Sequence, residues 1–419
     1  MRKIKVLWMS NKVQSSTNDN TTGSWLNALA EGLINTGEVE LGNISRGRVS
    51  KVVQQDFGKI SQWIVPILKS DPHSNLPEKG FISEIESVVN SYSPDLIHIW
   101  GTEDIWGLLS ARNFIHQPAL LEMQGLKGAI ACVFNGGLNI KEQLSCIGLK
   151  EILKQSSIYH ERKRYTKWRL IDQEIISRHH FITVQTEWME AQVKMVNHNC
   201  KIFRNDRLLR EIFYKTPPWQ YSDETIIFCA AAYPAPFKGL HVAIRATAIL
   251  KQQFPNIKLH IAGALQQSGI RKNGYIAWLN REILRLNLFS DVKWLGPISA
   301  DQIVNEIKSA TVMVLPSFIE NCSNLMQEGM MLGIPMVVSY VGGLPSLARD
   351  KKSVLFFPSG DEVMCSYQVK RLLTDRPLAE QVSRRAREIA LVRNDYRKVI
   401  QNQINTYHQV IRAVNSGEK

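Results

Sequence analysis

Short apolar runs alternate with longer segments of helical periodicity along the second half of the chain. The pattern is clearest at residues 240–254, where Val242, Ala246, Ile249 and Leu250 recur at three- and four-residue spacing. We predict strands at residues 226–231, 258–262, 292–295, 312–315, 336–339 and 354–357. We predict helices at residues 240–254, 275–288, 300–309, 325–332 and 362–375, and another from 378 to about 414. This alternation is typical of a parallel sheet that is buried on both faces.

The first half repeats the pattern less regularly, with predicted strands at residues 4–9, 96–100, 119–123 and 181–184, and helices at 24–35 and 81–91. Between the halves, Pro217 and Pro218 interrupt either element type, so we place a linker at residues 214–221. We expect an N-terminal Rossmann-like domain at 1–213, a C-terminal one at 222–395 and a terminal helix at 396–419. That helix either crosses back to the first domain or packs on its own. The fold class is α/β, with two doubly wound parallel sheets facing a central cleft.

The amino-acid composition limits the possible binding partners and the cellular compartment. The chain has 419 residues, of which 44% are hydrophobic and 21% charged, so a mainly disordered or collagen-like protein is excluded. A net charge of +13 makes phosphates, nucleic acids and anionic membranes plausible partners. The 6 cysteines are scattered without a zinc-ligand spacing, which favours a reduced, cytoplasmic chain. No apolar run reaches the length of about 18 residues needed to span a bilayer, so any membrane contact is expected to be peripheral.

The segment with the most specific chemistry follows the predicted strand at 312–315. A polar loop containing Glu320 leads to a helix that contains Glu328, and either Ser323 or Asn324 is suited to cap that helix. A helix start offers unpaired N–H groups and a partial positive charge, which suit a diphosphate. The two carboxylates are placed to accept hydrogen bonds from sugar hydroxyls. On the residues alone, a solvated Glu320 and a purely structural Glu328 remain an open alternative.

The spacing Glu320-x7-Glu328 resembles that of the retaining glycosyltransferases of family 4, whose two-domain fold is called GT-B. The resemblance continues in several short segments, at residues 238–240, 261–263, 315–317, 333–338, 342–345 and 357–361. In the first half it is carried only by residues 22–26 and 94–101. The order of these segments is specific, although each one alone is weak.

The resemblance implies a role for each matching residue. Glu320 contacts the donor sugar near the reacting carbon, and Glu328 holds the ribose hydroxyls. The backbone amides of Asn324 and Leu325 receive the diphosphate, and Lys238 stabilises it as it leaves. Charge builds on the departing phosphate in the transition state, so a fixed ammonium there lowers the barrier.

The remaining positions either match weakly or depart from the family pattern. Gly23 would let a loop of the acceptor-side N-terminal domain approach the phosphates. Gln124 stands where the family often has a histidine, and it can donate a hydrogen bond to the donor sugar. Tyr233 stands where the family commonly has an arginine, so half of the usual cationic clamp is absent unless Arg271 or Lys272 substitutes.

The expected activity is retaining, hexosyltransferase-like transfer of a sugar from a nucleotide diphosphate-sugar, such as a UDP- or GDP-sugar, to a hydroxyl acceptor. A saccharide or lipid-linked acceptor in polysaccharide or glycolipid biosynthesis is implied by analogy. Two alternatives remain open, namely a nucleotide-sugar epimerase of the same fold and a non-catalytic nucleotide-binding or membrane-adaptor protein.

Two further expectations concern partners. The chain has no Asp-x-Asp triplet, and Lys238 with a helix start can neutralise the phosphates, so we expect no metal and no other cofactor. The basic segment at 160–170 carries Tyr165 and Trp168, which favours contact with an anionic inner membrane face, although a solvated helix face explains it equally well. No nucleic-acid-binding motif accompanies the basic residues.

Overall fold

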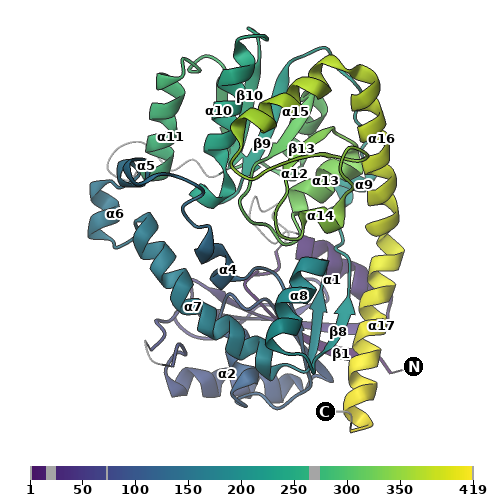
Figure 1. Ribbon diagram of the computed structural model, residues 1–419. Helices are drawn as coiled ribbons and strands as arrows, with labels where there is room; N and C mark the ends of the chain where they lie inside the picture. The colour runs from purple at the N-terminus through teal and green to yellow at the C-terminus, as the bar shows by residue number, and fades with distance from the viewer. Residues whose placement is uncertain (1, 16–24, 72–73, 264–273, 418–419) are drawn as a thin grey trace.

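The computed structural model describes residues 2–15, 25–71, 74–263 and 274–417. Within these residues, the strands form one sheet of eight strands and one of six (Figure 1). The eight-stranded sheet belongs to the N-terminal domain, and the six-stranded sheet belongs to the C-terminal domain. The expected α/β class with two parallel, doubly wound sheets is confirmed.

The N-terminal sheet has the order β3-β4-β2-β1-β5-β6-β7-β8, and only the β3–β4 pair is antiparallel among the described strands. Its strands are β1 (Ile4–Ser10), β2 (Val39–Gly47), β3 (Val53–Gln54), β4 (Ser61–Pro66), β5 (Leu96–Trp100), β6 (Ala119–Glu122), β7 (Phe181–Val184) and β8 (Lys201–Arg204). Its helices are α1 (Trp25–Asn35), α2 (Lys79–Tyr92), α3 (Trp106–Ala111), α4 (Lys127–Cys132), α5 (Ile140–Ser145), α6 (Leu149–Leu153), α7 (Ile158–Arg178) and α8 (Glu187–Val196).

The C-terminal sheet has the order β11-β10-β9-β12-β13-β14, and its strand pairs are parallel. Its strands are β9 (Ile226–Ala231), β10 (Lys258–Gly263), β11 (Val292–Gly296), β12 (Val312–Leu315), β13 (Met336–Ser339) and β14 (Leu355–Phe357). Its helices are α9 (Glu211–Lys215), α10 (Leu240–Lys251), α11 (Gly274–Arg285), α12 (Ala300–Ser309), α13 (Asn324–Leu332), α14 (Leu344–Leu347), α15 (Glu362–Thr374) and α16 (Arg376–Arg393). The pattern of apolar runs predicted every strand of this sheet.

The strands β2 and β4 were not predicted, because their buried positions include polar side chains. Asn43 and Ser45 are fully buried in β2, and Gln62 is buried in β4. The Asn43 amide donates to Gln62 Oε1 at 3.1 Å and accepts from the Ser10 hydroxyl at 2.9 Å. These hydrogen bonds satisfy the side chains of Asn43 and Gln62 inside the sheet. The buried polar residues interrupt the apolar runs that would otherwise mark the two strands.

The single helix expected from 378 to about 414 is wrong, because the chain forms two helices there. The helix α16 ends at Arg393 and α17 spans Tyr396–Asn415, with the side chain of Asp395 accepting a hydrogen bond from the Lys398 amide as its N-cap. The break lets the chain pass from one domain to the other, and α16 and α17 run down one side of the molecule (Figure 1).

The helix α17 packs against the N-terminal domain. Its buried face shares a hydrophobic core with β1 and α1, and includes Val399, Ile400, Ile404, Tyr407 and Val410. The Tyr407 hydroxyl accepts a hydrogen bond from Trp8 Nε1 at 3.1 Å and lies 2.9 Å from His98 Nδ1. The last helix therefore ties the end of the chain to the first strand. None of the described helices combines the length and apolar character that a membrane span requires.

Candidate active site between the two sheets

Lys238 is held by a tight loop that follows β9. A short 3₁₀ turn, Pro236–Lys238, ends at Gly239, whose backbone has φ +71°. A Cβ at Gly239 would lie 1.9 Å from the Pro316 carbonyl oxygen, so only glycine allows the loop to approach the end of β12 this closely. The Phe318 amide also donates to the Phe237 carbonyl at 2.7 Å. This packing fixes the ammonium of Lys238 beside the loop that carries Glu320.

Lys238 and Glu320 form an ion pair. The Lys238 Nζ to Glu320 Oε1 distance is 2.6 Å, and the Ser317 hydroxyl donates to the same oxygen at 2.9 Å. The two charged side chains are 26% and 18% exposed, so both remain accessible to a ligand. A lysine and a glutamate that lie 82 positions apart in the sequence are thus brought into direct contact.

The helix α13 begins beside this pair. Ser323 is its N-cap and accepts a hydrogen bond from the Met326 amide at 3.3 Å. Asn324 and Leu325 occupy the first turn, where amide N–H groups have no carbonyl partner within the helix. The helix start therefore supplies donors and a partial positive charge close to Lys238.

Glu328 lies one turn further along α13 and is buried, with 5% exposure. Burial raises the pKa of this carboxyl, and the neighbouring Arg210 opposes that shift. Arg210 Nη2 lies 2.7 Å from Glu328 Oε1, and Arg210 Nε donates to the same oxygen at 2.9 Å. Glu328 is thus placed near the helix start with an arginine partner that the sequence analysis did not identify.

Gln124 enters from the N-terminal domain, just after β6. Its backbone carbonyl accepts a hydrogen bond from Asn321 Nδ2 at 2.8 Å, and Asn321 directly follows Glu320. The Gln124 Oε1 atom accepts from Arg207 Nη2 at 2.7 Å, while Arg207 Nη1 donates to Asn324 Oδ1 at 3.0 Å. Gln124, Glu320 and the α13 start therefore lie around one junction between the domains.

Comparison with known proteins finds similarity both in part of the sequence and in the fold. Residues 214–389 match a family model described as Glycosyl transferases group 1. The match covers less than half of the chain, and the chain has the GT-B fold. The sucrose-phosphate synthase of Thermosynechococcus elongatus superposes with a TM-score of 0.72 at 15% identity, covering 98% of this chain and 100% of that one. The Anabaena protein HepE, solved with UDP and glucose, gives 0.66 at 14% identity, covering 97% and 100%.

Curated relatives match over a shorter stretch. The D-inositol 3-phosphate glycosyltransferase of Saccharomonospora viridis is 26% identical over 194 residues, which are 45% of this chain and 44% of that protein. The enzyme with the same description from Corynebacterium diphtheriae is 27% identical over 149 residues, covering 35% and 34%. The chain therefore spans less than half the length of the curated relatives it matches.

Some of the predicted positions cannot be placed in the site. Gly23, Arg271 and Lys272 lie outside the described residues. Tyr233 lies in the loop after β9 with 49% exposure, and it brings no positive charge. Arg207 and Arg210 were missed because they lie between β8 and the linker, where no local pattern marks a functional residue. Only the packing of this segment against α13 brings them to the site.

The N-terminal domain carries a second charged cluster, at the carboxyl ends of β5 and β6. Glu103 Oε1 accepts from the Gly125 amide at 2.6 Å, and burial raises the pKa of Glu103 to about 7. Burial also raises the pKa of Asp172, on α7, to about 6. Lys127 lies beside both carboxylates, with its Nζ 3.9 Å from the centre of the Trp168 ring.

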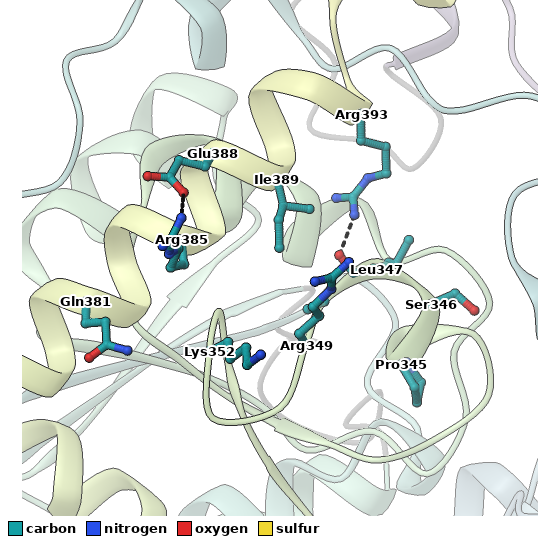
Figure 2. A pocket seen from close by; sticks show the side chains of 11 residues that line it. Pro345, Ser346, Leu347, Arg349, Lys352, Gln381, Arg385, Glu388, Ile389 and Arg393 are labelled. Atoms are coloured by element: carbon teal, nitrogen blue, oxygen red, sulfur yellow. Dashed lines mark hydrogen bonds and ion pairs between the residues drawn. The ribbon is translucent and has the colours of Figure 1, made fainter.

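A cavity of the molecule lies away from these residues. It measures about 760 Å³ and lies between α14 and α16 (Figure 2). Its lining includes Arg349, Lys352, Arg385 and Arg393, and Glu388 pairs with Arg385 at 2.6 Å. None of the predicted donor-site residues lines it.

Proposed function

We propose that the protein is a retaining glycosyltransferase that moves a sugar from a nucleotide diphosphate-sugar to a hydroxyl acceptor. The observation that carries the proposal is the contact of Lys238 with Glu320 at 2.6 Å beside the start of α13. An ammonium, a row of free amides and a carboxylate together match a diphosphate joined to a sugar. The group 1 family match over residues 214–389 supports the same activity.

The chemistry follows from these charges. The bond between the anomeric carbon and the diphosphate breaks, and negative charge builds on the departing phosphate. Lys238 and the α13 amides stabilise that charge, while Glu320 orients the sugar and favours positive character at the anomeric carbon. The acceptor oxygen bonds to the same face of the carbon, and its proton passes to the departing phosphate. In the ligand-free protein, Glu320 is the counter-ion of Lys238.

Substitution of Glu320 tests the role of this carboxylate. Glu320→Gln should lower transfer by at least about 100-fold in a panel of UDP- and GDP-hexoses with saccharide acceptors, while the melting temperature stays close to that of the wild type. Glu306→Gln is the matched control, because Glu306 pairs with His260 on the C-terminal domain at 2.7 Å and touches none of the site residues above. Full turnover by the Glu320 variant would contradict the proposal, as would a product of inverted anomeric configuration.

The donor we propose is a UDP-sugar, because a structural neighbour has been solved with UDP and glucose. The acceptor we propose is a polysaccharide or a lipid-linked saccharide, and a neighbour called WaaG is described as acting in lipopolysaccharide biosynthesis. Incubation with donor alone separates this activity from epimerisation, because an epimerase would change the sugar without an acceptor. Tight nucleotide binding with no turnover on any acceptor would instead indicate an adaptor protein.

We also propose that transfer needs no metal ion. Lys238 and the α13 amides supply positive charge where a divalent cation would otherwise act. Turnover should therefore be unchanged in excess chelator. A loss of turnover that magnesium or manganese restores would contradict this proposal.

We also propose peripheral membrane contact, but through a surface other than the one that carries Tyr165 and Trp168. Tyr165 and Trp168 of α7 face inward, and the Trp168 indole donates to the Thr102 carbonyl at 2.8 Å. Exposed apolar side chains gather instead on α5 and α6, namely Ile140, Leu144, Leu149, Ile152 and Leu153. Exposed cations lie close by in the chain, namely Lys141, Lys154, Arg162 and Lys163. Apolar side chains with flanking cations suit an anionic bilayer surface.

Vesicle binding tests this surface. The double variant Ile152→Glu/Leu153→Glu should lose co-sedimentation with phosphatidylglycerol vesicles, because both side chains are strongly exposed, at 60% and 75%. Phe289→Glu is the control, since Phe289 is 77% exposed on the other domain. Wild-type binding to neutral phosphatidylcholine vesicles that equals its binding to anionic ones would contradict the role of charge, as would unchanged binding by the double variant.

A further inference from the structure

Arg207 is a buried cation without a carboxylate partner among the described residues. The side chain belongs to the segment between β8 and α9, and the residue is 7% exposed. Its two side-chain hydrogen bonds go to the neutral amide oxygens of Gln124 and Asn324. Its Nε atom is buried and has no hydrogen-bond partner there. Buried charges in proteins are normally paired with an opposite charge, and this guanidinium lacks such an anion among the described residues.

Its guanidinium also packs on an aromatic ring, which holds it in place without neutralising it. The Arg207 Cζ atom lies 4.6 Å from the centre of the Trp25 ring. The Arg207 backbone is fixed as well, because its carbonyl accepts from Asn394 Nδ2 at 2.8 Å, at the break between α16 and α17. These contacts fix the backbone and the ring-facing side of Arg207. The N–H groups of its guanidinium can still exchange one hydrogen-bond acceptor for another.

The place of the guanidinium indicates what kind of ligand is missing. Arg207 Nη1 lies 3.0 Å from Oδ1 of Asn324, the first residue of α13, so the cation stands at an anion-binding helix start. The Gln124 Nε2 atom is another buried donor without a partner among the described residues. Two side chains with unused donors, Arg207 and Gln124, therefore meet beside the helix start. Guanidinium groups bind phosphate oxygens with two parallel hydrogen bonds, and they do so better than they bind neutral amides.

We infer that Arg207 binds the diphosphate of the donor, as the second cation of the site beside Lys238. The inference rests on the proposed function and adds a residue to it. When the diphosphate binds, phosphate oxygens replace the amide oxygens of Gln124 and Asn324 as acceptors of the guanidinium. The cation absent at Tyr233 is thus supplied by the segment between the domains. Arg207 forms hydrogen bonds to Gln124 of the N-terminal domain and to Asn324 of the C-terminal domain. The same side chain therefore takes part both in the contact between the domains and in diphosphate binding.

Binding measurements test this role. Calorimetric titrations of the full chain would use UDP, GDP, ADP and inorganic pyrophosphate as probes, with wild type, Arg207→Gln and Arg207→Lys. The glutamine variant should bind the preferred nucleoside diphosphate at least tenfold more weakly, and the lysine variant should fall between the two. Affinity for the matching nucleoside, measured by competition, should change less than twofold. Arg204→Gln is the control, because Arg204 precedes the same segment but pairs with Glu190, and its side chain is 62% exposed.

The thermal stability of the ligand-free variants separates ligand binding from a structural role. Removing an unpaired buried charge should leave the melting temperature of Arg207→Gln equal to or above that of wild type, while the rise produced by the nucleoside diphosphate shrinks. Equal diphosphate affinity in wild type and Arg207→Gln would overturn the inference. A lower melting temperature together with equal losses of nucleoside and diphosphate binding would also overturn the inference. That result would mean that Arg207 only holds the two domains together.

The outcomes for the inference and for the proposed function can be told apart. A wild-type protein that binds a nucleoside diphosphate through Arg207 but transfers no sugar would contradict the proposed function and support the inference. A protein that transfers sugar with unchanged efficiency after Arg207→Gln would support the proposed function and overturn the inference. A wild type that binds none of the four probes would overturn both.

Discussion

Removing the hydroxyl of Tyr407 tests how the last helix holds the N-terminal domain. Tyr407 is fully buried on α17, and its hydroxyl oxygen accepts from Trp8 Nε1 at 3.1 Å. The same oxygen lies 2.9 Å from Nδ1 of His98, whose pKa is lowered by burial, so that this imidazole is neutral near pH 7. In Tyr407→Phe, the Trp8 indole N–H and the His98 nitrogen both lose this partner inside the core.

Each buried polar group left without a partner costs about 1–3 kcal/mol. Two such groups predict a loss of roughly 2–6 kcal/mol in the free energy of unfolding for Tyr407→Phe. The measurement is urea-induced unfolding followed by tryptophan fluorescence, which reports on Trp8 among other residues. A loss of this size is large beside the net stability of a domain, which is about 5–15 kcal/mol.

Tyr396→Phe provides the control on the same helix. Tyr396 is 39% exposed, and no hydrogen bond from its hydroxyl is found to the described residues. Its removal should change the free energy of unfolding by less than about 0.5 kcal/mol, as for other exposed substitutions. If Tyr407→Phe is as stable as the control, the buried hydrogen bonds do not hold α17 on the first domain, and the reasoning fails.

Three further predictions concern the site and its surroundings. Lys238→Ala should lower kcat by about 10²- to 10³-fold, and Lys258→Ala, on β10, should not; equal rates would contradict the role of the ammonium. Gly239→Ala should lower both the melting temperature and turnover far more than the control Gly37→Ala. Both glycines have φ near +70°, but only a Cβ at Gly239 would meet a backbone oxygen. Similar losses in the two variants would show that the close approach of the loop to Pro316 is unimportant. Burial raises the pKa of Glu103 to about 7, so the folded protein binds this proton more tightly than the unfolded chain, and stability falls as pH rises from about 4.5 to about 7. Glu103→Gln should therefore gain melting temperature relative to wild type between pH 5 and pH 8, and a constant difference would refute the shift.

Much of the fold was predictable because apolar runs mark buried parallel strands. The strands β9, β12 and β13 begin and end at the residues expected from their apolar runs. The pattern failed at β2, where Asn43 and Ser45 are both buried and Asn43 forms hydrogen bonds to Ser10 and Gln62. Such polar burial depends on partners distant in the sequence, so no local periodicity reveals it.

The candidate site divides in the same way. The positions of Lys238, Glu320 and the α13 start followed from short segments of the C-terminal domain, in which chain order fixes the loops at the strand ends. Arg207 and Arg210 could not be predicted, because only the packing of the segment before α9 against α13 brings them to the site. The exposed apolar face of α6 also escaped notice, since its five residues are too few to show a helical period.

The central claim is that a nucleoside diphosphate binds between the domains, against Lys238 and the start of α13. The most direct test is a crystal structure of the full chain grown with UDP or another nucleoside diphosphate that raises its melting temperature. We predict phosphate oxygens within hydrogen-bond distance of Lys238 Nζ and of the amides of Asn324 and Leu325. A nucleotide found instead in the cavity lined by Arg349, Lys352 and Arg393, with Lys238 still paired to Glu320, would contradict the account.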